Sequence, residues 1–515
     1  MPHRISAFLR RRGVWLAAAV AWTMVRWAHG GITDDAFITF AYARTLLETG
    51  SLAFYPGAEA VYGTTVPLFA VFVAAGMALG FAPWVWVLAW DGVWLGLILW
   101  KTQDILENLG QGRWFGLVAA VWIVGSPATL PLGGMETGLF CALIAGVLAA
   151  VDARSHPGRV LAWATAAAAL RPDGAILWAI ALAYAAWWAW KNRAWRGAFW
   201  AVFVSGALLG LLGGLWLHVF ADWMPHSVRA KAIAAHDPRA VLFRTGFTSF
   251  FLHYWGAIQP LAIAGAALCV WHYRHPRTCV PAFVTVYGAV YCAARAPYFH
   301  WYLTPLVLPI YAAAVVGLGS VIRTGLRRMG PSTGLFAQPA ALVAVLLLWP
   351  QVAVFLRIHG REFRSLAPDT NQTAYRDAAR WVARESQSAD PPPFLAAHEI
   401  GSLAYFSGLP AFDLEGLVTP EAVVLRRAFP GESPLARRAV PWFVHPFDVA
   451  LDPAEDHPFH RWLTECGYRE AARYPCSPEV TIVFHGPGQP PFRRRLQRES
   501  LLPGHLVAWS EVGEE

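Results

Sequence analysis

The chain of 515 residues is 56% hydrophobic and only 14% charged, whereas a soluble domain is about a quarter charged. Its apolar residues lie in long blocks, and blocks of about 20 residues have the length that a helix needs to cross a bilayer. Composition therefore excludes an ordinary soluble protein and predicts a polytopic α-helical membrane protein. The net charge of +8 is interpreted first as a topology signal along the chain.

The first apolar run, from about residue 14 to residue 28, follows four arginines at positions 4, 10, 11 and 12. Because positive charge stays on the cytoplasmic side of a membrane, the N-terminus is predicted to be cytoplasmic. The adjacent Asp34 and Asp35 then emerge on the outer side. A cleaved signal peptide is the alternative, but "AHGGITDD" lacks a small-x-small cleavage site and many further apolar runs follow.

A helix is predicted directly after this run, with Thr33 as its N-cap and Gly50 at its end. Phe37, Phe40 and Leu47 lie on one side, so we expect this helix to lie in the membrane interface. It would hold both aspartates at the depth of a lipid headgroup. A structural alternative is open, because acidic residues in a first turn also complement the helix dipole.

Ten further apolar runs follow in the chain, near 66–82, 84–100, 114–130, 137–151, 159–190, 198–219, 255–271, 279–294, 303–321 and 338–356. The basic clusters "KNRAWR", "HYRHPR" and "RTGLRRM" predict cytoplasmic connections, which puts 220–254, 295–302 and the chain after about 357 outside. This topology needs an odd number of crossings. About eleven transmembrane helices satisfy it if 159–190 crosses once, but "ALRPDGAIL" interrupts that run, so two short helices are the alternative.

Composition becomes polar from about residue 361. Residues 374–385 are predicted to form an amphipathic helix, and "PFLAAHEIGSLAYFSGLPAFDLEG" has the pattern of strand, helix and strand, with further strands in "PWFVHPFDVAL" and "EVTIVFH". We expect a transmembrane catalytic domain at 1–358, with a first outer loop at 29–65, and an extracytoplasmic α/β domain at 359–515 that is large enough for its own core. Cys466 and Cys476 could form a disulfide in that domain.

The aspartate pair at a membrane edge favours sugar transfer from a lipid phosphate, in which a carboxylate acts as general base on an acceptor hydroxyl. The departing phosphate needs cations to stabilise its charge. Candidates on the outer side are Arg44, Arg229, Lys231 and Arg295, of which Lys231 is favoured because the charge pattern places its loop outside. For each of them, a snorkelling side chain at the interface is an equal alternative.

Several aromatic and polar side chains are predicted to bind the sugar. Tyr55, Tyr62, Trp301 and Tyr302 could stack on sugar faces, with His300 beside them, or could simply form the aromatic belt of a membrane protein. The histidines and cysteines show no metal-ligand spacing, so no metal site is predicted. Two adjacent aspartates could nevertheless hold one divalent cation such as Mg or Mn, with water filling the other positions.

The stretch "DDAFITFAYARTLLETGSLAFYPG" resembles the first outer loop of bacterial GT-C glycosyltransferases, and in particular of the terminal arabinofuranosyltransferase-like family. Further matches follow in the same order along the chain: "GMETGLF" (134–140), "LRPDG" (170–174), "MPHSVRAKA" (224–232), "WYLTPL" (301–306) and "EIGSLAYFSGLPAFDLEGLVTPE" (399–421). The resemblance covers nearly the whole chain and includes the C-terminal domain.

The resemblance implies a GT-C enzyme of the bacterial inner membrane that uses a polyprenyl-phosphate sugar donor and an extracytoplasmic glycan or glycolipid acceptor. It also implies inversion at the anomeric carbon with a first-loop aspartate as base. We favour Asp34 for this role, with Asp35 orienting the acceptor or the base. Glu136 would line the cavity if its loop faces outward, and a helix-terminal glutamate is the alternative.

Two departures from the family pattern bear on the donor. Ala41 stands where arginine is frequent, and His226 where asparagine is frequent; both positions could touch the donor, so arabinofuranose is only one candidate sugar. A polytopic transporter or flippase of a lipid-linked saccharide is the main rival. A non-enzymatic scaffold is a third hypothesis, although it gives no reason for the aspartate pair. His398 and Glu399 are interpreted as a helix start after a strand, without a catalytic role.

Overall fold

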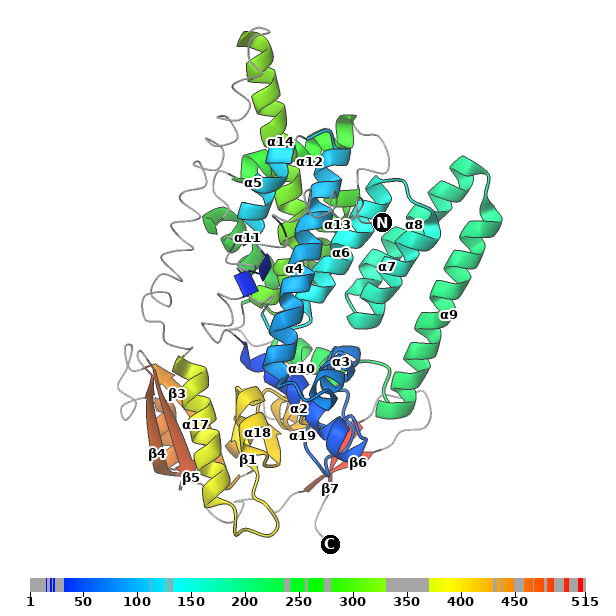
Figure 1. The fold of residues 1–515 in the computed structure, drawn as a ribbon. Helices are drawn as coiled ribbons and strands as arrows, with labels where there is room; N and C mark the ends of the chain where they lie inside the picture. The colour runs from blue at the N-terminus through cyan, green and yellow to red at the C-terminus, as the bar shows by residue number, and fades with distance from the viewer. Residues whose placement is uncertain are drawn as a thin grey trace. The chain divides into compact units, whose positions relative to one another are not determined.

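The structure is a computed structural model of the chain. It describes residues 32–111, 113–124, 126, 129, 133–235, 241–254, 258–272, 279–329, 370–428, 433–436, 438, 440–448, 458–465, 467–476, 479–485, 495–499 and 508–512, together with 15, 19–20 and 22–23. The chain divides into two compact units, which are described separately (Figure 1). The first unit comprises Met1–His29, Val87–Leu212 and Val241–Leu366; the second comprises Gly30–Trp86, Gly213–Ala240 and Ala367–Glu515.

The first unit is helical. Its described helices are α5 (Arg113–Val124), α6 (Thr137–Asp152), α7 (Pro157–Leu170), α8 (Gly174–Asn192), α11 (Phe243–Tyr254), α12 (Ile258–His272), α13 (Cys279–Ala293), η2 (His300–Tyr302) and α14 (Thr304–Met329). Helix α4 (Pro83–Asn108) starts in the second unit and ends in the first, whereas α9 (Trp195–Phe220) starts in the first unit and ends in the second. Neighbouring helices such as α12 and α14, or α7 and α8, pack directly against each other.

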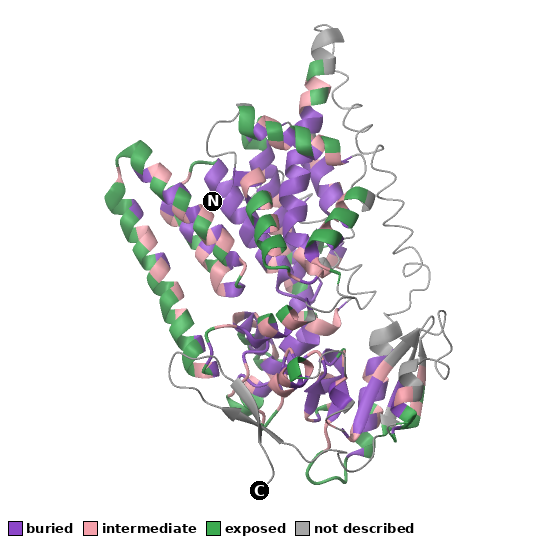
Figure 2. Cartoon of the chain, turned by 180° about the vertical axis from the view of Figure 1, so that it is seen from behind, coloured by how far each residue is buried: buried purple, intermediate pink, exposed green. Residues whose placement is uncertain are grey.

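Three described helices are long and apolar enough to cross a membrane: Pro83–Asn108, Trp195–Phe220 and Thr304–Thr324. Five shorter helices are also apolar: Pro67–Ala78, Phe115–Val124, Thr137–Asp152, Ile258–Trp271 and Cys279–Ala293. The most apolar stretch of α14 is 83% buried, whereas that of α9 is only 11% buried (Figure 2). An apolar helix with an exposed surface is suited to contact with lipid.

Most predicted apolar runs coincide with helices, while the runs at 14–28, for the most part, and at 338–356 lie outside the described residues. The run at 159–190 forms two helices, α7 and α8, so the expectation of one crossing there is replaced by its alternative. Pro172 lies in the break, where its missing N–H and fixed φ disfavour a continuous helix. The count of eleven transmembrane helices stays a prediction.

In the second unit, α2 (Asp34–Thr49) ends at Gly50, as predicted; the glycine adopts a left-handed φ of 74° that closes the helix. Thr33 occupies the N-cap position, but its side chain makes no capping hydrogen bond. The position of α2 relative to a membrane stays a prediction, but part of its apolar side is covered by protein. Phe37 and Phe40 are buried against helix α18 (Gly401–Ser407). Both rings contact Tyr405, and Phe37 also contacts Phe406, with ring centroids 5.2–6.1 Å apart.

The second unit also contains α3 (Pro67–Ala78), α10 (His226–Ala234) and the C-terminal α/β region, which is built on a mixed five-stranded sheet. The strand order is β2 (Ala411–Asp413), β1 (Leu395–Ala397), β3 (Trp442–Asp448), β5 (Glu479–His485) and β4 (Arg469–Cys476). Strand β1 pairs in parallel with β2 and β3, whereas β3, β5 and β4 are antiparallel. The other elements are α17 (Thr370–Glu385), α18, α19 (Pro420–Ala428), η4 (Pro434–Ala436), α20 (Pro458–Glu465) and the hairpin of β6 (Arg495–Glu499) and β7 (Ala508–Val512).

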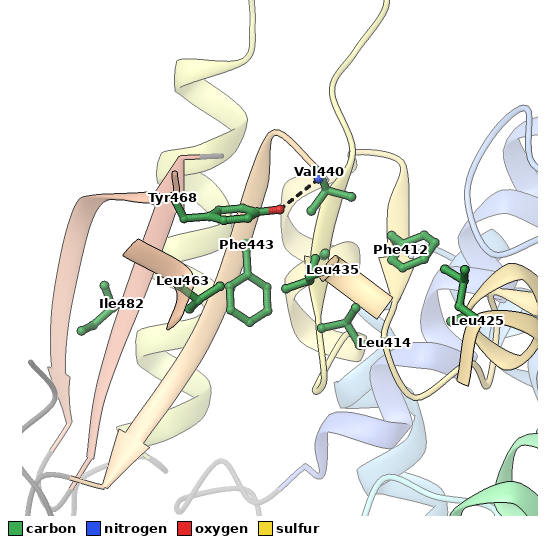
Figure 3. Packing of buried hydrophobic residues seen from close by; sticks show 11 residues of the cluster. Phe412, Leu414, Leu425, Leu435, Val440, Phe443, Leu463, Tyr468 and Ile482 are labelled. Atoms are coloured by element: carbon green, nitrogen blue, oxygen red, sulfur yellow. Dashed lines mark hydrogen bonds between the residues drawn. The ribbon is translucent and has the colours of Figure 1, made fainter. Parts of the chain in front are cut away.

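The sheet carries its own hydrophobic core (Figure 3). Phe412, Phe443 and Ile482 come from three strands, and Leu463 of α20 and Tyr468 pack with them. The hydroxyl of this tyrosine accepts a hydrogen bond from the backbone N–H of residue 440 at 3.1 Å. The helix at 374–385 and the strands expected at β1, β2, β3 and β5 are confirmed, while α19, α20, β4, β6 and β7 were not predicted. The side chains of both cysteines of the expected disulfide lie outside the described residues.

Candidate functional site

Asp34 begins α2, and its carboxylate receives three hydrogen bonds from the start of α18. The Gly401 N–H donates to Oδ2 at 2.8 Å, and Ser402 donates to Oδ1 from its N–H at 2.8 Å and from its Oγ–H at 2.5 Å. Burial raises the pKa of Asp34, and the hydrogen bonds from Ser402 and Gly401 oppose this rise because they stabilise the charged form. Asp35 is the next residue in the same turn and is half-buried.

Arg44 lies on α2 and holds the other end of α18. Its guanidinium donates to the Tyr405 carbonyl at 2.6 Å and lies 5.0 Å from the centroid of that ring. Glu48 is 4.0 Å away on the same helix. A carboxylate at the start of α18 and a cation at its end both complement the peptide dipoles of that helix. Arg44, which was predicted to bind the donor phosphate, therefore contacts Tyr405 and Glu48 of its own unit.

The segment of residues 61–63 joins α2, α10 and the loop that follows β2. The Tyr42 hydroxyl donates to the carbonyl of residue 61 at 2.8 Å, and the His226 N–H donates to the Tyr62 carbonyl at 2.6 Å. The Tyr62 ring stacks on Phe220 at 4.7 Å. A Cβ placed on Gly63 would lie 2.6 Å from the Tyr42 hydroxyl oxygen and 2.9 Å from the carbonyl oxygen of residue 417. Only glycine allows this close approach without a shift of its neighbours.

Helix α10 contributes a group of buried polar side chains. Arg229 pairs with Asp222 at 2.6 Å. Burial and the nearby Arg229 charge lower the pKa of His226 to about 4, so its imidazole is neutral at pH 7. Among the described residues, His226 Nε2, Ser227 Oγ and Arg229 Nε are buried without a hydrogen-bond partner. Lys231 is half-buried on the same helix.

The loop after β2 is organised by two carboxylates. Asp413 accepts hydrogen bonds from the N–H groups of residues 415, 417 and 418, and burial raises its pKa to about 7. Burial would also raise the pKa of Glu415, but the hydrogen bond from His398 and the charge of Arg426 outweigh this effect and lower it to about 2. Glu415 lies 3.0 Å from His398 Nδ1 and 2.8 Å from the Arg426 guanidinium. These contacts place His398 beside the loop after β2.

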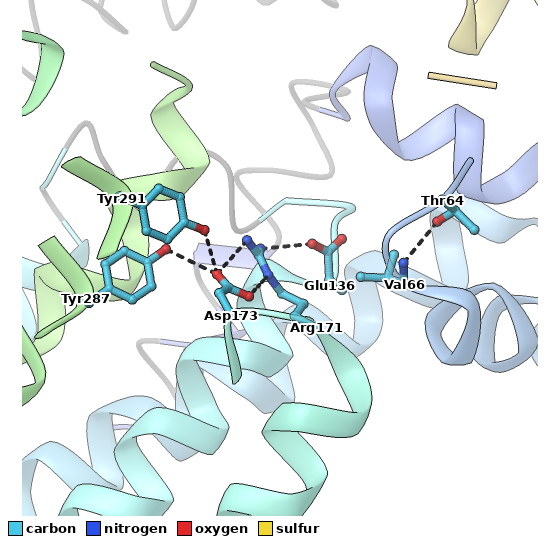
Figure 4. A network of polar contacts seen from close by, with 7 residues as sticks. All are labelled: Thr64, Val66, Glu136, Arg171, Asp173, Tyr287 and Tyr291. Carbon is cyan, nitrogen blue, oxygen red and sulfur yellow. Dashed lines mark hydrogen bonds and ion pairs between the residues drawn. The ribbon is translucent and has the colours of Figure 1, made fainter. Parts of the chain in front are cut away.

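The first unit contains a buried ionic network that the sequence analysis did not identify (Figure 4). Arg171 pairs with Glu136 at 3.0 Å and makes two hydrogen bonds to Asp173 at 3.0 and 3.1 Å. The hydroxyls of Tyr287 and Tyr291 also donate to Asp173, at 3.2 and 2.9 Å. The signal in the sequence was "LRPDG", because an arginine and an aspartate that interrupt an apolar run are costly to bury unless they are paired. Glu136, expected to line a cavity, belongs to this network.

The other predicted sugar-binding residues lie among aromatic side chains. In the second unit, Tyr55 packs edge-on against Phe394 at 6.2 Å, and burial raises its pKa. In the first unit, Trp301 stacks on Phe299 at 4.6 Å and Tyr302 lies 4.9 Å from the ring of Tyr291. Trp301 and Tyr302 belong to η2, and Arg295, which precedes this helix, is exposed. His300 begins η2, but its side chain lies outside the described residues.

The described part of the chain contains no group of three or more His, Cys, Asp or Glu side chains placed to hold a metal ion. A cation bound between Asp34 and Asp35 does not fit this arrangement well. The Asp34 oxygens accept three hydrogen bonds from N–H and O–H donors, and a metal-binding carboxylate would need its lone pairs for the ion.

Known structures share this fold over nine-tenths of the chain. ArnT from Cupriavidus metallidurans in the apo state aligns with a TM-score of 0.53 at 16% identity, covering 91% of this chain and 97% of ArnT. The same enzyme bound to undecaprenyl phosphate aligns at 0.50 with 14% identity and the same coverage. The apo oligosaccharyltransferase of Archaeoglobus fulgidus gives 0.51 at 12% identity, covering 90% of this chain and 72% of the enzyme. Arabinofuranosyltransferase AftD from Mycobacteria gives 0.50 at 16% identity over 94% of this chain, which spans 41% of AftD.

The family comparison covers a smaller part of the chain. Residues 361–486 match a family described as a domain of unknown function (DUF8728), and no curated protein matches the sequence. The chain therefore has the fold of GT-C glycosyltransferases, with the apolar helices of an integral membrane protein and a C-terminal mixed α/β region. This confirms the resemblance found in the sequence at the level of the fold.

Proposed function

We propose that the protein is an inverting glycosyltransferase that moves a sugar from a polyprenyl-phosphate donor to a glycan or glycolipid acceptor outside the cytoplasm. Arabinofuranose is one candidate sugar. In this proposal the protein spans the bacterial inner membrane, its domain at 359–515 is extracytoplasmic, and the aspartate pair and α10 form the reaction site. The GT-C fold supports the proposal by analogy, because one fold can serve different functions.

The observation that carries the proposal is the group of buried polar atoms on α10. A buried donor or acceptor without a partner costs about 1–3 kcal/mol, so His226 Nε2 and Ser227 Oγ are best explained by a ligand that completes their hydrogen bonds. The His226 ring donates its one proton to the Gly416 backbone through the other nitrogen, so Nε2 of the neutral ring is an acceptor, whereas Ser227 Oγ can donate. Lys231 adds positive charge on the same helix, and Arg229, although its charge is paired with Asp222, keeps a buried Nε without a hydrogen-bond partner. Donors and cations together suit the phosphate of the donor, and they can stabilise its charge as it leaves.

The aspartate pair supplies the base in this proposal. The reaction forms a bond between the acceptor oxygen and the anomeric carbon, breaks the bond from that carbon to the phosphate oxygen, and passes the hydroxyl proton to a carboxylate. Asp34 is the proposed base and Asp35 orients the acceptor. Two of the hydrogen bonds to Asp34 reach Oδ1 and one reaches Oδ2, so Oδ2 keeps one acceptor position beyond these bonds.

Sugar transfer by the purified protein in lipid tests this proposal. Radiolabelled polyprenyl-phosphate sugars and short glycan acceptors are offered to wild type, Asp34→Asn and Asp35→Asn. We expect transfer from one donor, reduced roughly 10²–10⁴-fold when the base is lost. Glu48→Gln is the matched control, because it makes the same change at an exposed position of the same helix. No transfer from any donor, or full activity of both aspartate variants, would contradict the proposal.

A further inference from the structure

The start of α18 has an unusual relation to the first outer loop. Gly401 and Ser402 lie more than 360 residues after Asp34 in the chain, yet their backbone and side-chain donors converge on its two carboxylate oxygens. Both belong to the same compact unit. Asp34 is half-buried, and a carboxylate that is partly removed from water is stabilised in its charged form when donors replace the lost solvent, as these three hydrogen bonds do.

The position of Gly401 depends on the absence of a side chain. A Cβ at residue 401 would collide with the backbone carbonyl of Asp34 and would lie 2.9 Å from its Oδ2. Glycine therefore lets the backbone of α18 reach the carboxylate. Ser402 is fully buried, so its hydroxyl has little freedom to exchange Asp34 for water.

Contacts farther along both helices fix the alignment of α18 with α2. Arg44 donates to the Tyr405 carbonyl at 2.6 Å, and the rings of Phe37 and Phe40 pack on Tyr405. The carboxylate of Asp34 is thus held by a helix that is anchored at both of its ends. Its position depends on α18, which belongs to the C-terminal region and not to the helices of the first unit.

We propose that Ser402 and Gly401 are positioning residues for Asp34, so that the C-terminal domain completes the catalytic site of the transferase. This inference rests on the proposed function, because it takes Asp34 as the base. Ser402 fixes the orientation of the carboxylate with two bonds to Oδ1, which directs the other acceptor position of Oδ2 toward the acceptor hydroxyl. The C-terminal domain then has a direct part in catalysis in addition to any role in binding glycan.

The test measures the pH profile of sugar transfer by the full-length protein in lipid for wild type, Ser402→Ala and Ser402→Thr. Loss of the hydroxyl removes a hydrogen bond that stabilises the charged form, so the pKa of Asp34 rises. The acidic limb of kcat/KM should then move up by about one pH unit or more, because a hydrogen bond to a charged group contributes about 1.5–3 kcal/mol. We expect kcat at pH 7 to fall about tenfold or more, with the KM for the donor almost unchanged, and Ser402→Thr to recover much of the loss.

Ser407→Ala is the matched control, because it removes a serine hydroxyl from the same helix at the end that is away from Asp34. Gly401→Ala, which retains the Ser402 hydroxyl, should also lower kcat because its Cβ displaces the carboxylate. If Ser402→Ala keeps the wild-type pH profile and kcat while Asp34→Asn is inactive, the positioning role is refuted and the transferase stands. If Asp34→Asn retains full activity, Asp34 is not the base, and the positioning role of Ser402 and Gly401 is refuted together with that assignment. Absence of transfer by wild type overturns both proposals.

Discussion

Replacement of Arg171 by methionine should destabilise the first unit strongly. The guanidinium makes three hydrogen bonds of 3.0–3.1 Å to the buried Glu136 and to Asp173, whose side chain is 10% exposed, and only 6% of the arginine side chain is exposed. Methionine fills much of the same volume but leaves Glu136 and Asp173 buried without their cation. Removing one partner of a buried ion pair costs about 3–5 kcal/mol, because the remaining charge is uncompensated.

The measurement is the melting temperature of the purified protein in detergent, followed by tryptophan fluorescence at a fixed scan rate. At about 2–4 °C per kcal/mol for a domain of 150–250 residues, the expected decrease is about 6 °C or more. Lys191→Met is the matched control, because it removes an exposed cation from the last turn of α8 and should change the melting temperature little. A melting temperature of Arg171→Met equal to that of wild type, or an equal decrease in the control, would refute this account of the network.

Three further predictions concern the second unit. Burial raises the pKa of Asp413 to about 7, so the native state binds the proton of this carboxyl more tightly than the unfolded chain does. This stabilisation is lost as the pH rises from about 4 to 7, and the melting temperature should fall over that range. Asp413→Asn should flatten the fall, and an unchanged slope would refute the assignment. Gly63→Ala should lower the melting temperature by several degrees, because the added Cβ would collide with the Tyr42 hydroxyl. Gly57→Ala is the comparison variant: its Cβ would meet nothing within 4 Å, but its φ is 82°, so this variant measures the effect of backbone strain alone. Ser227→Ala should weaken binding of undecaprenyl phosphate about fivefold, since one hydrogen bond contributes about 1 kcal/mol. Wild-type affinity should show no step near pH 6.5 from His226, whose lowered pKa keeps it neutral; an inflection there that His226→Ala abolishes would contradict the prediction.

Local signals in the sequence were sufficient for most helices and for α2 in particular. The left-handed Gly50 ends that helix where the sequence predicted it, and the apolar runs mark the helices of the first unit because burial in lipid or protein needs continuous apolar surface. The environment of α2 was not predictable in the same way. Its apolar side could face lipid or protein, and the covering rings of Tyr405 and its neighbour lie more than 360 residues away in the sequence.

The candidate site shows the same division. Residue type and resemblance predicted Asp34, Arg229 and His226, but the contacts that orient Asp34 and His226 are long-range, whereas Arg229 pairs with Asp222 nearby in the sequence. No pattern in "EIGSLAYF" indicates that Ser402 donates to Asp34, because a buried hydroxyl can satisfy a local carbonyl equally well. The pairing of Arg171 was accessible in part, since charges within an apolar run imply a partner, although the two tyrosines of α13 could be assigned only from the fold.

The stoichiometry of donor breakdown tests the central claim most directly. Purified protein in liposomes would receive a doubly labelled polyprenyl-phosphate sugar and a soluble glycan acceptor, and free polyprenyl phosphate would be measured together with sugar on the acceptor. A glycosyltransferase predicts one polyprenyl phosphate released for each sugar incorporated, with the anomeric configuration inverted in the product. Passage of the intact lipid-linked sugar across the bilayer, with no polyprenyl phosphate released, would contradict the account and favour a flippase.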